Sequence, residues 1–138
     1  MDGPLRYSDV VLDHSRNPRN VGDLPGAAFA QVGDPATGDV LRISIRIEDG
    51  TIVEARFKAF GCTAAIAAGS MATTLLVGRS VEEAARLTNR DVVSALGGLP
   101  EPKVQCSVLA EQAIKEALRR HHEALERDRD KEAVRCRS

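Results

Sequence analysis

The 138-residue sequence has few aromatic side chains: no tryptophan, one tyrosine and three phenylalanines. Surfaces that bind single-stranded nucleic acid depend on aromatic stacking, so a base-stacking function is not expected. The net charge of −1 gives no overall attraction to nucleic acid or to an anionic membrane. No apolar run reaches membrane-spanning length, and residues 1–4 lack the charged start and apolar core of a secretory signal. We therefore expect a cytoplasmic protein with no nucleic-acid or membrane partner.

Cysteine is also scarce. The three cysteines are Cys62, Cys106 and Cys136, and no two of them form a Cys-x-x-Cys pair. In a reducing compartment, three cysteines are more consistent with metal binding, redox chemistry or no special role than with disulfide bonds. Hydrophobic residues make up 43% and charged residues 28% of the chain, which is typical of a globular domain with a real core.

Strand patterns occupy the first half of the chain. Apolar residues at every second position from Leu41 to Ile47 predict a strand with one buried face. Asp49-Gly50 is a strong hairpin signal, and the following alternation, which begins at Val53, predicts the return strand. A first short strand is expected at residues 28–32. The prediction is an antiparallel three-stranded sheet with one face open to water.

Helical patterns surround these strands. A run of small and apolar residues over positions 63–77 is apolar on all sides, as in a buried central helix. A capping box, Ser80 to Glu83, starts the next short helix. Further helices are expected at residues 7–14, 81–87, 89–96 and 105–125. The fold class is therefore α+β, with helices on one face of the sheet and a long C-terminal helix. Residues 1–126 form the domain, and the charged residues 127–138 are expected to be a disordered tail.

Cys62 stands where the return strand becomes the small-residue helix. The unpaired N–H groups and the dipole of a helix N-terminus favour a thiolate, which attacks sulfur or binds metal. The alternative is a small buried hydrophobic residue, which is the commonest fate of a free cysteine. Asp39 ends a polar loop before a strand, and Cys106 opens the last helix. If these three positions meet, they form part of a ligand set for zinc or iron.

Four segments together resemble the IscU/NifU-type iron–sulfur cluster scaffolds. They are the run from His14 to Asn20, Gly38-Asp39, Phe60-Gly61-Cys62, and residues 103–111 around Cys106. The resemblance covers residues 7–125. It implies a scaffold, not an enzyme, that takes sulfur from a cysteine desulfurase, binds iron, assembles a transient [2Fe–2S] cluster and passes it to apo acceptor proteins.

The resemblance also assigns roles to residues. Asp39, Cys62 and Cys106 become the metal and cluster ligands, and Cys106 becomes the persulfide acceptor. The segment of Leu99, Pro100, Glu101, Pro102 and Lys103 is similar to the motif that binds an Hsp70-type chaperone, which works with a J-protein.

Two positions depart from the family pattern. Thr37 replaces the first cysteine, and Gln105 replaces the histidine before the last cysteine. A threonine hydroxyl is a poor substitute for a thiolate, and glutamine cannot act as an imidazole. Besides the scaffold, two functions therefore stay open: a zinc-binding persulfide acceptor that activates a desulfurase, and a regulatory homologue without metal. No specific role is expected for Cys136 in the charged tail.

Overall fold

The computed structural model describes the backbone of residues 6–137 and the side chains of residues 6–129. Its helices and strands follow the expected order with small changes at the ends. The elements are α1 (Asp9–Arg16), β1 (Ala28–Gly33), β2 (Val40–Glu48), β3 (Thr51–Phe60), α2 (Thr63–Leu76), α3 (Val81–Ala85), α4 (Asn89–Ala95), the 3₁₀ helix η1 (Glu101–Lys103) and α5 (Val104–Arg137).

The three strands form one antiparallel sheet in the order β1-β2-β3. Asp49 and Gly50 close the β2–β3 hairpin with φ angles of 51° and 76°. Positive φ at both central positions is the geometry of the tight hairpin turn that Asp-Gly favours. The predicted sheet and α+β class are therefore confirmed.

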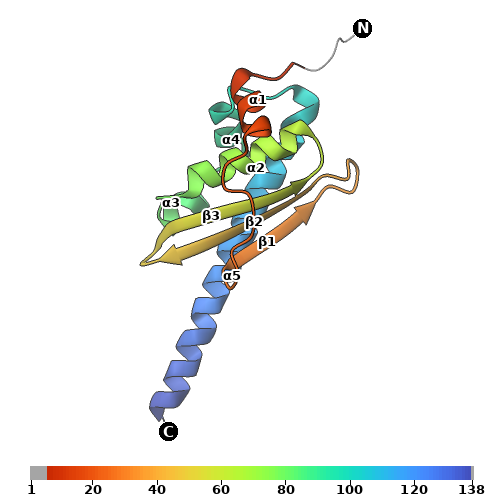
Figure 1. Ribbon diagram of the computed structural model, residues 1–138. Coiled ribbons are helices and arrows are strands. Elements are labelled where there is room, and N and C mark those ends of the chain that lie inside the picture. The colour runs from red at the N-terminus through yellow and green to blue at the C-terminus, as the bar shows by residue number, and fades with distance from the viewer. Residues whose placement is uncertain (1–5, 138) are drawn as a thin grey trace.

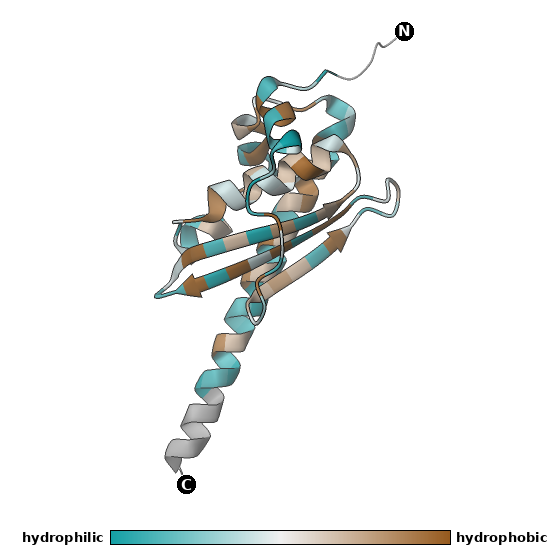
Figure 2. Ribbon diagram, viewed as in Figure 1, coloured by the Kyte–Doolittle hydropathy of each residue, from teal (hydrophilic) through white to brown (hydrophobic). Residues whose placement is uncertain are grey.

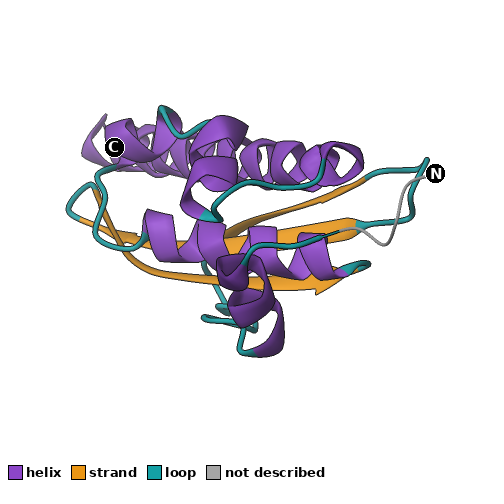
Figure 3. Ribbon diagram, turned by 90° about the horizontal axis from the view of Figure 1, so that it is seen from above, coloured by secondary structure: helices purple, strands orange, loops and turns teal. Residues whose placement is uncertain are grey.

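Helices α2 and α5 lie next to each other against one face of this sheet (Figure 1 and Figure 3). The sheet contributes Leu41, Ile43, Ile45 and Phe57 to the core, all 2% exposed or less. Gly69 lets α2 approach closely, because a Cβ there would lie 2.5 Å from Cδ2 of Phe57. The predicted central helix is thus buried and packs directly on the sheet.

The opposite face of the sheet is less open than expected. The loop after α1 crosses it (Figure 1), and Asp23 in that loop pairs with Arg42 at 3.3 Å and Lys58 at 3.0 Å. The same loop joins the edge of β3, where the Gly22 N–H donates to the Phe57 carbonyl. Ser44 on β2 is only 2% exposed, although the alternation placed it on the wet face.

One strand assignment was wrong at the hairpin end of β3. Val53 is 42% exposed, and its neighbour Ile52 is buried instead. The pairing register shifts between Arg46 and Ile47, so the alternation changes phase there. The three-stranded sheet itself is unaffected.

Helix α5 extends beyond the predicted end at Leu125 to Arg137. Its C-terminal half projects away from the sheet (Figure 1), and the part of that half that is coloured in Figure 2 is mainly hydrophilic. The boundary at residue 126 and the disorder of the tail stay predictions, and side chains from residue 130 on lie outside the described part. Neither α5 nor any other described helix combines the length and hydropathy that a membrane crossing needs.

Candidate metal centre

Three chain segments meet at the end of the sheet where β3 leads into α2. They are the β1–β2 loop with Asp39, the β3–α2 junction with Cys62, and the first turn of α5 with Cys106. One donor atom from each residue lies within 4.8 Å of the other two. The structure therefore brings together the three residues that the sequence selected as ligands.

The β1–β2 loop holds Asp39 through its own backbone. The side chain of Asp34 accepts the Ala36 N–H at 2.9 Å, and the Asp34 carbonyl accepts the Gly38 N–H at 2.8 Å. The Asp39 N–H donates to the Thr37 hydroxyl oxygen at 3.2 Å. Thr37 is exposed, and its hydroxyl supports the loop. Asp39 is only 6% exposed.

Gly61 makes the contact between Asp39 and Cys62 possible. The Cys62 N–H donates to Oδ1 of Asp39 at 3.1 Å. A Cβ at position 61 would lie 1.9 Å from that same oxygen, and Gly61 has φ +149°. Only glycine fits there without displacing the carboxylate. The Gly-Cys pair is visible in the sequence, but the reason for the glycine appears only in the fold.

The donor distances suit one tetrahedral ion. The sulfurs of Cys62 and Cys106 are 3.7 Å apart. Oδ2 of Asp39 lies 3.9 Å from the Cys62 sulfur and 3.7 Å from the Cys106 sulfur. Metal–sulfur bonds of about 2.3 Å and metal–oxygen bonds of about 2.1 Å place two thiolates about 3.8 Å apart and a thiolate and a carboxylate about 3.6 Å apart. Three corners of a tetrahedron are therefore present, and the fourth remains for another ligand.

The electrostatics differ from the expectation of two thiolates. Burial raises the pKa of the Cys106 thiol to about 12, and Cys62 and Asp39 add to the rise. Without metal, Cys106 is therefore a thiol at neutral pH. A bound cation must displace its proton, as thiol ligands generally require.

Lys103 adds a positive charge beside this group. The pKa of its ammonium is raised, first by the nearby Cys62 and also by Tyr7, Cys106 and Asp39. The sequence places Lys103 in the proline-rich segment and at the start of the run around Cys106, and gives it no role beside the thiols. Its proximity to the thiols depends on the turn that η1 makes before α5, which the residue pattern does not reveal.

The remaining predicted residues are not part of the donor group. Gln105 is exposed, and Cys136 lies outside the described side chains. The segment before Cys106 is partly or fully exposed, and part of it forms η1. Its role in binding a chaperone stays a prediction. This segment consists of Leu99, Pro100, Glu101, Pro102 and Lys103.

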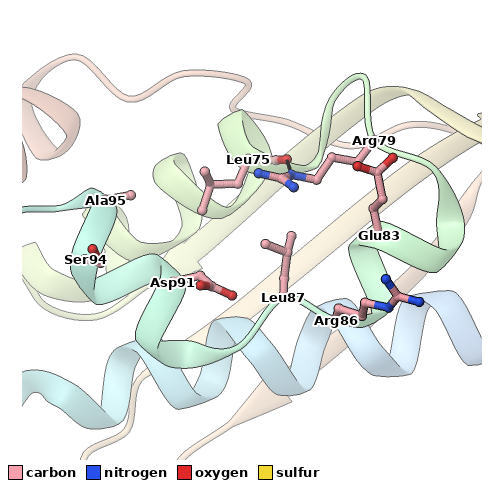
Figure 4. Close-up of a pocket in the computed structure, with 8 residues that line it drawn as sticks. All are labelled: Leu75, Arg79, Glu83, Arg86, Leu87, Asp91, Ser94 and Ala95. Carbon is pink, nitrogen blue, oxygen red and sulfur yellow. Dashed lines mark hydrogen bonds between the residues drawn. The ribbon is translucent and has the colours of Figure 1, made fainter.

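A cleft of about 420 Å³ lies at the other end of α2, between α2, α3 and α4 (Figure 4). Two of its carboxylates serve as helix caps: Glu83 accepts the Ser80 N–H, and Asp91 accepts the Thr88 N–H. Leu75 and Leu87 supply apolar surface, and no cysteine or histidine lines the cleft. The cleft therefore has no thiol donors like those in the group of Asp39, Cys62 and Cys106.

Comparisons with known proteins find similar sequences and folds. Residues 6–127 match the model of the NifU-like N-terminal domain. The chain is 48% identical over 120 residues to the iron-sulfur cluster assembly scaffold protein IscU of Azotobacter vinelandii, covering 83% of this chain and 93% of that protein. It is 47% identical over 113 residues to the scaffold protein IscU 1 of Archaeoglobus fulgidus, covering 81% and 74%.

Solved structures are similar as well. The crystal structure of a NifU-like N-terminal protein from Brucella abortus superposes with a TM-score of 0.67 at 18% identity, covering 84% of this chain and 94% of that one. At that identity the likeness concerns the fold alone, and the fold is the α+β arrangement described above.

Proposed function

Because this chain belongs to the family of NifU-like N-terminal domains, we propose that it is a scaffold on which iron–sulfur clusters are assembled and from which they are transferred. The observation that carries the proposal is the convergence of Asp39, Cys62 and Cys106 at tetrahedral spacing. Relatives that are 47–48% identical are named as such scaffolds.

In this proposal the cluster is cargo. Cys62 and Cys106 bind one iron through sulfur, and Asp39 supplies an oxygen that binds iron less softly than a thiolate does. A [2Fe–2S] cluster takes four protein ligands, one more than this group offers. The fourth comes from outside the group, for example from a second chain. The lack of a fourth ligand within the group suits a scaffold, because a weakly bound cluster is easily transferred to an acceptor protein.

The sulfur and the partners follow from the same assignment. Cys106 receives sulfur from a cysteine desulfurase, and apo iron–sulfur proteins receive the finished cluster. The exposed part of residues 99–103 lies directly before Cys106 in the chain. A chaperone of the Hsp70 type, assisted by its J-protein, binds residues 99–103 in this proposal. It then lies next to the cluster ligands.

A second function has its own support. Three donors with one free corner describe an open zinc site, and the Thr37 hydroxyl is engaged with the Asp39 N–H at 3.2 Å. A zinc-loaded protein of this kind would take persulfide from a desulfurase without building a cluster.

Anaerobic reconstitution with iron, cysteine and a cysteine desulfurase tests the two functions. We expect the native protein to develop the visible absorption of an iron–sulfide cluster, and Cys62→Ser and Cys106→Ser to lose it. Thr37→Cys should hold the cluster longer against a chelator, and Cys136→Ser serves as the matched control. Retained zinc with no iron–sulfide absorption would overturn the scaffold proposal in favour of the zinc site. Absence of any bound metal would favour the remaining function, that of a regulatory homologue without metal.

A further inference from the structure

The side chains of Cys62 and Cys106 face each other with no atom between their sulfurs, which are 3.7 Å apart. Both are free thiols. We propose that Cys62 acts on a persulfide carried by Cys106 and releases its outer sulfur as sulfide, leaving a Cys62–Cys106 disulfide. The inference rests on the proposed sulfur-accepting role of Cys106 and adds an activity to it: the scaffold itself reduces the sulfur it receives.

The step is a thiol–disulfide exchange. The Cys62 sulfur attacks the inner sulfur of the persulfide, which is Sγ of Cys106. A bond forms between the two cysteine sulfurs, and the bond from Cys106 to the outer sulfur breaks. The outer sulfur leaves with the electron pair as hydrosulfide, so it is reduced by two electrons while the two cysteines together are oxidised by two. The Cys62 proton passes to the hydrosulfide or to water. A dithiol reductant then restores both thiols.

The position of each cysteine suits this step. Cys62 is the N-cap residue of α2 but makes no side-chain cap hydrogen bond, so its sulfur is free to turn toward Cys106. Oδ2 of Asp39 lies 3.9 Å from the Cys62 sulfur, within reach of the thiol proton. Cys106 is held in the first turn of α5 and is 3% exposed, so the Cys62 sulfur is the thiol that already lies beside it.

Thr37 provides no competing thiol at this site. A hydroxyl does not attack a persulfide as a thiol does. Within the described side chains, Cys62 is the one other thiol beside Cys106. The disulfide would also remove two of the three metal donors. Sulfide release and metal binding would therefore alternate, with the dithiol reductant returning the site to its metal-binding state.

Mass spectrometry of the intact, metal-free protein tests the inference. The reduced full-length chain is mixed anaerobically with cysteine trisulfide as a sulfane donor, desalted and followed in time, with free sulfide measured in parallel. The variants are Cys62→Ser, Cys106→Ser and Cys136→Ser. Serine is a favoured N-cap residue, so Cys62→Ser is expected to keep α2 and the fold. Cooperative unfolding of each variant checks this.

We expect the native protein and Cys136→Ser to lose two hydrogens, to yield a peptide joining Cys62 to Cys106, and to release sulfide after desalting. Cys62→Ser should instead keep one added sulfur on Cys106 and release none. A native protein that keeps its persulfide, or a Cys62→Ser variant that releases sulfide equally fast, would overturn the inference alone. Cys62→Ser without added sulfur on Cys106 would remove the sulfur-accepting role, and the inference with it.

Discussion

At the scale of single residues, a glycine of the β1–β2 loop and a glycine of the β3–α2 junction differ in what surrounds them. Gly38 and Gly61 both have positive φ, at +78° and +149°. A Cβ at Gly38 would meet nothing within 4 Å, whereas one at Gly61 would lie 1.9 Å from Oδ1 of Asp39. Backbone strain is thus common to both positions, and displacement of the Asp39 carboxylate belongs to Gly61 alone.

Substituting each glycine with alanine separates these effects. Both variants should lose about 1–3 kcal/mol in the free energy of unfolding through backbone strain. Gly61→Ala should in addition weaken zinc binding about 10- to 100-fold, the usual loss when a contact that orients a ligand is removed. Competition with a chromophoric chelator measures the affinity. Equal zinc affinity in Gly61→Ala and Gly38→Ala would contradict the role of the Asp39–Cys62 contact.

The sequence predicted Asp39, Cys62 and Cys106 as one group because each stands at the end of a predicted element, where loops carry function. It could not give the state of Cys106, whose pKa is raised by burial and by neighbours that are distant in the chain. It also could not show that the Thr37 hydroxyl accepts the Asp39 N–H. The first property depends on tertiary contacts, and the second on the conformation of the β1–β2 loop.

At the scale of elements, α1 is tied to α2 through His14. Its Nδ1 lies 2.7 Å from the Ser70 hydroxyl, and that oxygen accepts the Arg19 N–H at 2.9 Å. Burial lowers the pKa of His14 from 6.5, and the Arg19 charge lowers it further, while Asp13 opposes the shift. The folded state therefore favours the neutral imidazole.

The lowered pKa of His14 makes the free energy of unfolding depend on pH. The unfolded chain binds a proton at higher pH than the folded chain, so His14 stabilises the fold above its unfolded pKa and this contribution is lost as the pH falls. We expect the free energy of unfolding to decrease from about pH 7 to pH 5, and to decrease less in His14→Asn. Urea denaturation across this range measures both. Identical slopes in the two proteins would rule out His14 as the source.

Helix α2 contains Gly69, a residue type that helix interiors disfavour. Glycine inside a helix costs about 1 kcal/mol relative to alanine. Gly69→Ala should nevertheless destabilise the protein by about 1–3 kcal/mol, because the new Cβ would overlap Phe57 and Leu41. Thermal or urea unfolding measures the change. Adding Phe57→Leu should make the loss smaller than the sum of the single changes; additive or stabilising effects would contradict the overlap.

Local patterns predicted most elements because they are encoded in neighbouring residues. The Asp49-Gly50 hairpin and the Ser80–Glu83 capping box are present as expected. The assignment of Val53 failed because the register shift between Arg46 and Ile47 is not marked by any residue type in the sequence. Burial of Ser44, which is 2% exposed, was missed because alternation within one strand does not show what packs against its second face.

At the scale of the whole molecule, the sheet and α2 use only the first part of α5. Among the side chains of α5 that the structure describes, the last one buried in the core is Leu118. Beyond it, the described side chains of 119–129 are exposed or half-buried. A chain truncated after Arg127 should therefore unfold cooperatively, with its free energy of unfolding changed by no more than about 0.5 kcal/mol. Loss of cooperative unfolding would mean that the distal helix supports the fold.

The central claim is that Asp39, Cys62 and Cys106 act as one metal site. Anaerobic titration with Co²⁺ tests it most directly, because absorption from sulfur-to-cobalt charge transfer reports each thiolate bound and the visible bands report the coordination geometry. We predict one tetrahedral Co²⁺ per chain with two thiolates, a smaller charge-transfer band in Cys62→Ser and in Cys106→Ser, and no change in Cys136→Ser. A band that persists in the first two variants and disappears in Cys136→Ser would contradict the account.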